Sequence, residues 1–582
     1  MSELEQQTDE LQQQLRSSSQ SEPAFPERSW KSVNTVNVNV SHTAEAESRL
    51  ASVAPFFRGA TIAPTSFRSL SHAVESLQTP ESLTHDPQPL LTLPRNLDGQ
   101  TISSRDIDEL FQTYFRDYAN FMPILDPSMS PNAYYALSPF LFWTIVGVAC
   151  RSYPRNPTLL GFLPAKIHNM ALLTLNATVT LQVVQGLLLV LCWPFPKSST
   201  GHDLNYPLAG ALVHMATQMG LHLPVSSQEF SRVRLKLDDD EIKRRAETWG
   251  YCQLIYMRSC FSKGNPISAI FDIPHESEQK RILYEKMPAG LKFELKLQDV
   301  VTRCCTAVSQ NGLRVMSLDQ ERSLDTLLAL FQAQIATISL DHPSINDQFY
   351  VRVAALSVQC FVLFKSPPSQ DPQSLYNLCV AACQVVESFE ILEKSGTMNL
   401  PASGLFAYLN IMLPCHILLR LLKTSFSTFI DIERAKAALF LGISLHKRMS
   451  LQNDDLPARN GAILTNLWNS NQAFKKPNGS EAVALRVRSR LVGSILLDGF
   501  LWCREEHGNA IGVYAPPLTD RTDETQRHDE ATGLPLSNAL TSNLMKQDFS
   551  SFLDDPMLIE FGWSIGDDIF SPAWADGTIA PI

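Results

Sequence analysis

The chain has 582 residues, of which 44% are hydrophobic and 18% are charged, and its formal net charge is −11. This acidic balance, without any run of Lys or Arg, excludes nucleic-acid binding driven by overall charge. The 11 cysteines are scattered, mostly through apolar segments, and no secretory signal opens the sequence. We therefore expect reduced thiols and an intracellular protein.

The chain opens with a short coiled-coil pattern. In ELEQQTDELQQQL, residues 3–15, Leu4, Leu11 and Leu15 have heptad-like spacing, with Gln and Glu at the outer positions. Such a short helix is marginal in water, so residues 1–18 are interpreted as the end of a longer dimerising coiled coil. The alternative is a frayed, glutamine-rich terminus.

Composition divides the rest of the chain into three parts. Residues 19–104 are rich in Ser, Thr, Pro, Gln and Asn without a helical or strand period, which predicts a disordered linker. Residues 105–505 are dense in Leu, Ala, Phe and Val at helical spacing, so we expect one large all-α domain or two fused ones. Residues 506–582 are again poor in core-forming pattern and are predicted to be a disordered tail.

The segment 203–224 shows the helical pattern most clearly. Apolar residues recur three or four positions apart on one face, namely Leu204, Leu208, Leu212, Met215 and Met219. Gly220 is placed as a C-terminal cap, with Pro224 beyond it. Further helices of this kind are predicted over 107–118, 321–340, 376–394, 432–448 and 484–506.

Three strongly apolar segments, 137–150, 181–195 and 404–422, raise the question of membrane spans. The first two are shorter than the roughly 20 residues that cross a bilayer, and the third carries Asn410, Pro414 and His416. We interpret all three as buried helices and predict no membrane partner.

Enzyme signatures are missing from the sequence. It contains no phosphate-binding loop, dinucleotide fingerprint, GxSxG elbow, HExxH or EF-hand loop. Cys379 and Cys383 lie one turn apart, but no segment offers the remaining ligands of a metal site, so both are interpreted as core residues. The same holds for Cys304-Cys305 and Cys415-His416, while His214 and His222 are read as helix-surface and loop residues. No catalytic residue, metal ligand or cofactor is predicted.

The charged stretch 238–249 resembles a well-capped helix start. Asp238 to Glu241 favour the N-terminal dipole, and Arg244 and Arg245 follow within reach of intrahelical ion pairs. We expect this helix start to be solvated.

The order of pieces around this stretch resembles the fungal zinc-cluster (Zn2Cys6) transcription factors. Their regulatory domain has a Gly-Leu-His turn, an acidic turn leading into Arg-Arg and Trp, and a Gly-Arg-Pro element. The matching residues here are Gly220, Leu221 and His222, then Arg244, Arg245 and Trp249, then Gly264, Asn265 and Pro266. Asn265 stands where Arg is usual. Segments 114–131, 138–153 and 183–196 resemble earlier parts of the domain, so the likeness covers about 105–505 and is nearest to leucine-pathway and weak-acid-response regulators.

The resemblance implies partners that the residues alone do not. In that family a six-cysteine, two-zinc cluster binds DNA, and a coiled coil pairs two copies. The first cysteine here is Cys150, so this sequence lacks that cluster. Either the chain is a truncated gene model or isoform, or its DNA contact comes from a partner.

The final segment, 548–582, combines aromatic and acidic residues. Seven acidic residues and no Lys or Arg accompany an apolar set that includes Phe549, Phe552, Phe561, Trp563, Phe570 and Trp574. This composition is typical of an activation segment that binds a coactivator groove. A tail that docks back on the helical domain is the alternative.

Together these patterns predict a nuclear regulator of RNA polymerase II transcription. The helical domain would hold the tail in check and release it when a small-molecule inducer or a partner binds. Two alternatives remain: a helical enzyme acting on an apolar metabolite, and a non-DNA-binding protein that dampens an intact family member.

Overall fold

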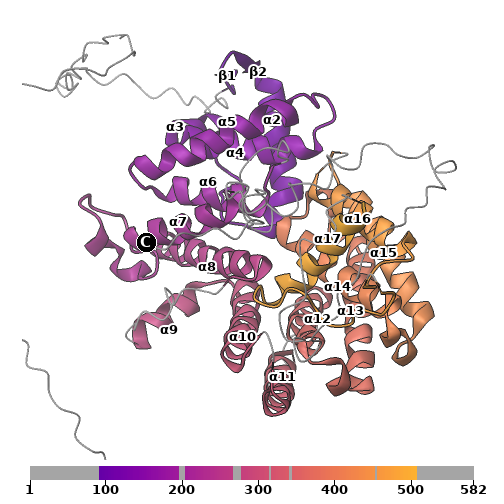
Figure 1. The fold of residues 1–582 in the computed structure, drawn as a ribbon. Helices are drawn as coiled ribbons and strands as arrows, with labels where there is room; N and C mark the ends of the chain where they lie inside the picture. Colours follow the sequence, from indigo (N-terminus) through magenta and orange to yellow (C-terminus); the bar gives the residue numbers. More distant parts are fainter. Residues whose placement is uncertain are drawn as a thin grey trace, which may run out of the picture. The chain divides into compact units, whose positions relative to one another are not determined.

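The computed structural model describes residues 91–195, 204–265, 277–313, 316–339, 344–452, 455–476 and 478–507. In these residues nearly all regular structure is helical (Figure 1), which confirms the predicted all-α class. The predictions for 1–90 and 508–582 lie outside the described residues. They concern the dimerisation residues Leu4, Leu11 and Leu15, and the tail residues Phe549, Phe552, Phe561, Trp563, Phe570 and Trp574.

A short hairpin precedes the helices. Strand β1, Arg95–Leu97, pairs antiparallel with β2, Gln100–Ile102. Asp98 and Gly99 form the two-residue turn, with φ of +46° and +90°. A tight hairpin turn of this kind needs positive φ at both positions, which favours Asp-Gly. Residues 95–102 of the predicted disordered linker therefore form a hairpin, and the Asp98-Gly99 pair is the sequence signal for its turn.

The helices enclose two clusters of buried apolar side chains. The first cluster is built mainly by α2 (Ser104–Thr113), α3 (Pro131–Leu137), α4 (Pro139–Ala149), α5 (Leu159–Leu173), α6 (Leu181–Cys192), α7 (Asn205–Gln218) and α8 (Asp239–Lys263), with α9 (Ser277–Lys286) adjoining α8. The second is built by α11 (Leu318–Ser339), α12 (Ile345–Gln359), α13 (Pro372–Lys394), α14 (Leu405–Lys423), α15 (Ile432–Met449), α16 (Leu456–Asn469) and α17 (Gly493–His507). Helix α10, Ala289–Asn311, contributes to both.

Short helical turns connect these elements. They are the π-helical turn η1 (Tyr114–Tyr118) and the 3-10 turns η2 (Ala119–Phe121), η3 (Cys150–Ser152), η4 (Thr174–Asn176), η5 (Pro224–Phe230), η7 (Cys360–Phe364), η8 (Pro367–Ser369), η9 (Leu400–Ala402) and η10 (Ser425–Phe429). One of them, η9, contributes to both clusters, because Leu400 belongs to the second and Ala402 to the first. The Trp193 indole after α6 donates to the Ala402 carbonyl at 2.9 Å.

Most predicted helices are confirmed, and the last one is corrected. Helix α7 buries Leu208, Leu212 and Met215 as its spacing predicted. The helix predicted over 484–506 begins only at Gly493. Residues before it are not helical because the Arg486 amide donates to the Asp498 carboxylate at 3.0 Å, and Leu491 has a φ of +46°.

Three stretches, Ile345–Phe364, Pro372–Lys394 and Leu405–Lys423, are long and apolar enough to cross a membrane by length and composition. The third contains the segment with Asn410, Pro414 and His416, and these residues do not prevent it from qualifying by length and composition. Its most apolar window is 78% buried inside the protein, against 61% and 56% for the others. Burial against neighbouring helices therefore accounts for its composition.

Candidate regulatory site

The predicted Gly-Leu-His turn is the C-terminal cap of α7. The amide of Leu221 donates to the Ala216 carbonyl at 3.1 Å, and the amide of Gly220 donates to Thr217 at 2.9 Å. These two bonds form a Schellman motif, in which the residue after the helix adopts positive φ; Gly220 has φ of +68°. Leu221 is fully buried beside this cap, so the first two motif residues end the helix and anchor it in the core.

His222 lies inside the fold rather than on a solvated loop. Its ring is edge-on to Phe230 in η5, with centroids 5.3 Å apart, and lies 5.7 Å from the ring of Trp249 on α8. His222 and Trp249 are both buried. Two motif residues from different pieces of the sequence therefore pack together and fix the α7 corner against α8.

The N-terminus of α8 has the predicted cap and ion pairs. The Asp238 carboxylate accepts from the Glu241 amide at 2.9 Å. The Glu241 carboxylate in turn pairs with Arg244 at 2.8 Å and Arg245 at 2.9 Å. The expectation of a solvated helix start is wrong for Arg245, which is only 5% exposed and pairs with a largely buried Glu241 carboxylate.

The C-terminus of α8 is a second Schellman cap, at Gly264. The amide of Asn265 donates to Cys260 at 2.9 Å, and the amide of Gly264 donates to Phe261 at 3.1 Å. A Cβ on Gly264 would lie 1.7 Å from the carbonyl oxygen of Arg490, so only glycine permits this approach. Pro266 lies outside the described residues.

Asn265, which stands where the family pattern has Arg, joins two distant parts of the chain. Its side-chain oxygen accepts from the Arg490 guanidinium at 2.5 Å. Arg490 lies three residues before α17, so the α8 corner holds the segment that leads into that helix. In this contact the arginine is Arg490, and the α8 corner supplies the asparagine that accepts from it.

The α8 helix also borders a group of cavities that the motif did not predict. Three adjoining cavities, of about 800, 470 and 350 Å³, all have Arg258 of α8 and Phe406 of α14 in their walls. The Arg258 guanidinium lies 3.5 Å from the Phe406 ring centroid and pairs with Glu294 of α10 at 2.5 Å. The pair is neutral overall, and the remaining walls are mostly apolar.

Two buried amides line these cavities without a partner among the described residues. They are the side-chain nitrogens of Asn410 on α14 and Gln298 on α10, both in residues only 7% exposed. A buried amide without a hydrogen bond costs free energy, so such groups mark places where an occupant is favoured. Hydrogen-bond acceptors on a largely apolar, neutral molecule would satisfy them.

The 470 Å³ cavity extends to the start of the last described helix. Val492, Gly493 and Leu496 form part of its wall together with Asn410. An occupant of this cavity would therefore contact α8, α14 and the first turn of α17.

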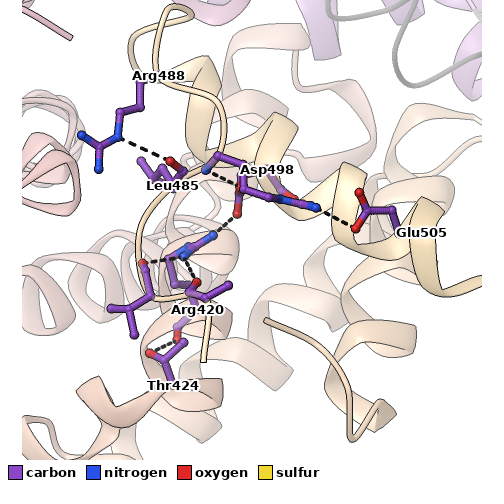
Figure 2. A network of polar contacts seen from close by, with 9 residues as sticks. Arg420, Thr424, Leu485, Arg488, Asp498 and Glu505 are labelled. Carbon is purple, nitrogen blue, oxygen red and sulfur yellow. Dashed lines mark hydrogen bonds and ion pairs between the residues drawn. The ribbon is translucent and has the colours of Figure 1, made fainter. Parts of the chain in front are cut away.

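Helix α17 is fixed to α14 by buried charges. The Arg420 guanidinium, 1% exposed, pairs with the fully buried Asp498 carboxylate and donates to the Val483 carbonyl at 2.9 Å. In Figure 2, Arg420 and Asp498 point toward one another from the two helices. Burial and the nearby Arg486 lower the pKa of Arg420 to about 9, which leaves it charged at neutral pH.

Arg486 extends this network along α17. Its guanidinium lies 3.4 Å from Asp498 and 2.6 Å from Glu505. It also lies 4.1 Å from the ring centroid of Trp502. Arg420, Asp498 and Arg486 are here called the α14–α17 charge network.

A chain of uncharged polar side chains lies in the same core. Asn460 on α16 accepts from His416 Nε2 at 2.8 Å and donates to His446 Nε2 at 2.8 Å. His446 Nδ1 therefore carries the proton that it donates to the Gly442 carbonyl at 2.7 Å. Burial lowers the pKa of both histidines to about 4, so both are neutral.

The paired cysteines and His214 occupy the positions predicted for them. Cys304, Cys305, Cys379, Cys383 and Cys415 are buried in the second cluster, and His214 is exposed on α7. Within the described ranges, no group of three or more His, Cys, Asp or Glu could hold a metal ion.

The comparisons with known proteins agree with the resemblance. Residues 110–266 match the family described as "Fungal specific transcription factor domain". This match ends at Pro266 and so contains all three pieces of the motif. It is shorter than the predicted span of 105–505.

Relatives match over a longer stretch. The chain is 23% identical over 509 residues to the regulatory protein LEU3 of Saccharomyces cerevisiae, covering 77% of this chain and 56% of that protein. It is 23% identical over 492 residues to the putative transcription factor SEF1 of Eremothecium gossypii, covering 78% and 44%. It is 22% identical over 475 residues to the transcriptional regulatory protein SEF1 of Candida albicans, covering 76% and 49%.

The predicted resemblance to fungal transcription factors is therefore confirmed. The chain spans about half the length of the curated relatives that it matches. No solved structure matches it.

Proposed function

We propose that this chain is a regulator of RNA polymerase II transcription that acts in the nucleus. The observation that carries the proposal is the match of 110–266 to the fungal specific transcription factor domain, with the motif in its expected order. The names of the relatives favour this function over the alternative of an enzyme acting on an apolar metabolite. Two sources of the DNA contact are open. One is a zinc cluster that the given sequence does not include, and the other is a dimer partner paired through Leu4, Leu11 and Leu15.

The geometry supports a specific form of regulation. The cavity beside Asn410 contacts the first turn of α17, and the chain continues from α17 into the predicted activation tail. A neutral, mostly apolar effector that fits one arrangement of α17 better than another would shift the exposure of that tail. The effector site and the tail would thus be coupled through one helix.

The function is tested by tethering the 582-residue chain to a reporter gene through an unrelated DNA-binding domain. We expect altered reporter transcription that is lost when Phe561 and Trp563 are both replaced by Ala, because aromatic side chains carry coactivator binding. Replacing Leu534 and Leu536 by Ala, outside the aromatic segment, is the matched control and should leave transcription unchanged. A chain that is nuclear and folded but leaves the reporter unaffected would contradict the proposal.

The coupling is tested by filling the cavity. Leu496→Phe adds volume at the α17 wall, while Leu464→Phe adds the same volume in the second cluster away from the cavities. Leu464→Phe overpacks a filled core and should be the more destabilised of the two variants. Only Leu496→Phe should change reporter output per molecule of protein. Equal effects of the two variants would argue against coupling through α17.

A further inference from the structure

Two aromatic rings lie partly open to solvent where α15 and α16 meet. Phe440 of α15 is 48% exposed, and Trp468 of α16 is only partly buried. The ring centroids are 5.3 Å apart, and the ring planes meet at 79°. Two rings at nearly a right angle form a corner that a compact apolar group can fill. We call these two rings the aromatic corner.

The aromatic corner also offers a hydrogen-bond donor. The indole N–H of Trp468 donates to no atom of the described residues. Lys423 of α14 lies 5.5 Å from the Trp468 ring centroid, and its ammonium group already donates to the Ser470 carbonyl at 2.7 Å. A segment that covers the indole would therefore need mainly apolar side chains and one carbonyl group for the N–H.

Helix α17 ends close to the aromatic corner. Helix α16 packs against both α15 and α17 (Figure 1). Burial lowers the pKa of Lys423, and the carboxylate of Glu506 in the last turn of α17 is near enough to oppose this shift. Lys423 thus lies within reach of both the end of α17 and the Trp468 ring. The chain therefore leaves α17 beside the exposed rings.

The sequence that follows α17 has the composition that such a corner binds. Residues 508–518, GNAIGVYAPPL, contain no charged residue, and charges return only at Asp520. Consecutive prolines favour the polyproline II conformation, which aromatic-lined grooves bind at a low cost in chain entropy. Tyr514 lies eight residues after Glu506, which allows a span of up to about 26 Å. The length of chain is therefore sufficient to reach the rings.

We propose that residues 514–518, YAPPL, bind the aromatic corner of their own chain. A proline ring packs between the Phe440 and Trp468 rings, and a backbone carbonyl of the segment accepts from the Trp468 indole. Segments further along the chain compete less well, because effective concentration falls as the connecting chain lengthens. Residues 514–518 thus act as a strap that fixes where the rest of the tail leaves the helical domain.

This binding does not depend on the proposed transcriptional function. It concerns the root of the tail and the outer surface of α15 and α16, and it involves neither the cavities around Arg258 nor the aromatic residues of 548–582. The experiment below measures contacts within the full chain and has no transcriptional readout. Failure of one proposal is therefore distinguishable from failure of the other.

The test is photo-crosslinking of the purified 582-residue chain with p-benzoylphenylalanine in place of Tyr514. We expect crosslinks to peptides that contain Phe440 or Trp468. Replacing Pro516 and Pro517 together by Ala should lower their yield by about threefold or more, because the preformed polyproline conformation is lost. Replacing Pro535 and Pro556 by Ala is the matched control and should leave the yield unchanged.

A variant of the binding surface completes the test. Phe440→Ala should lower the yield of crosslinks to Trp468 to a similar extent, with thermal melting used to verify that the chain is folded. Leu330→Ala, at a leucine of α11 that is 53% exposed, is its control and should leave the yield unchanged. Because the proline variants do not alter the helical domain, they remain informative if Phe440→Ala fails to fold.

Three outcomes would overturn the proposal. They are crosslinks to other parts of the helical domain only, no crosslinks at all, and a yield that is unaffected by loss of Pro516 and Pro517. A mixture of isotopically light and heavy chains identifies the occupant. Crosslinks within one chain are expected, whereas crosslinks that mainly join light to heavy chains would show that a second copy supplies the segment and would overturn the same-chain assignment.

Discussion

Two buried arginines of the second cluster have opposite surroundings. Arg420, on α14, meets Asp498 and a backbone carbonyl inside the α14–α17 charge network. Arg459, on α16, lies beside an open cavity with its Nε unpartnered among the described residues. The first arrangement holds two helices together, whereas the second leaves the guanidinium without a carboxylate partner among the described residues. Burial alone therefore does not tell whether an arginine holds the fold together; its partners do.

The largest effect is expected from breaking the partnered arrangement. Asp498→Asn removes the negative charge and leaves Arg420 buried without compensation. Breaking a buried ion pair in this way typically costs about 3–5 kcal/mol. Urea unfolding should therefore show a loss of this size. Asp299→Asn, which breaks an ion pair with Arg303 in which both side chains are exposed, is the control and should change stability by about 1 kcal/mol or less. A small effect at Asp498 would mean that the network does not hold α17.

Acidification should weaken the same core through its neutral histidines. Burial lowers the pKa of His416 and His446 to about 4, below the usual value of about 6.5. The unfolded chain therefore binds more protons, and the free energy of unfolding falls as pH drops from about 6.5 toward 4. The loss should reach about 3 kcal/mol for each histidine.

Unfolding measured across this pH range tests the expectation. His446→Asn should flatten the pH dependence, although it also removes a buried hydrogen bond. His214→Asn, at the exposed histidine of α7, should leave the pH dependence unchanged. A slope that is unaffected in His446→Asn would show that other groups cause the acid sensitivity.

A smaller effect separates helix capping from docking at the α8 corner. Gly264→Ala places a Cβ at positive φ and against the Arg490 carbonyl, while Gly396→Ala meets open space at φ of +72°. The left-handed conformation alone costs about 1–2 kcal/mol. Gly264→Ala should cost roughly 1–3 kcal/mol more than Gly396→Ala, because the Arg490 segment must move. Equal unfolding free energies would mean that this contact is not tight.

Much of the fold was predictable from local pattern. The spacing of Leu208, Leu212 and Met215 predicted the buried face of α7, and the acidic turn after Asp238 predicted the start of α8. The order of the motif pieces indicated the family. Each of these sequence patterns lies within one helix or the turn at its end.

The polar features of the interior were not predicted because their partners are far apart in sequence. Asp498 lies 78 residues from Arg420, and Asn265 lies 225 residues from Arg490. The one available signal was an isolated charge inside an apolar helix, as with Arg258 and Asp498. The helical spacing of 484–492 likewise does not reveal that the Arg486 amide is satisfied by the Asp498 carboxylate, 12 residues further on.

The most direct test of the contrast between these two arginines is the same substitution at both positions. Urea unfolding of Arg420→Met and Arg459→Met should be measured together with the unaltered chain. Arg420→Met should lower the free energy of unfolding by about 3–5 kcal/mol, since it leaves Asp498 without its closest partner. Arg459→Met should leave it unchanged or raise it by about 1 kcal/mol or more, because an unpaired buried charge is removed. A similar loss at both positions would contradict the distinction between an arginine that a buried carboxylate holds and one without such a partner.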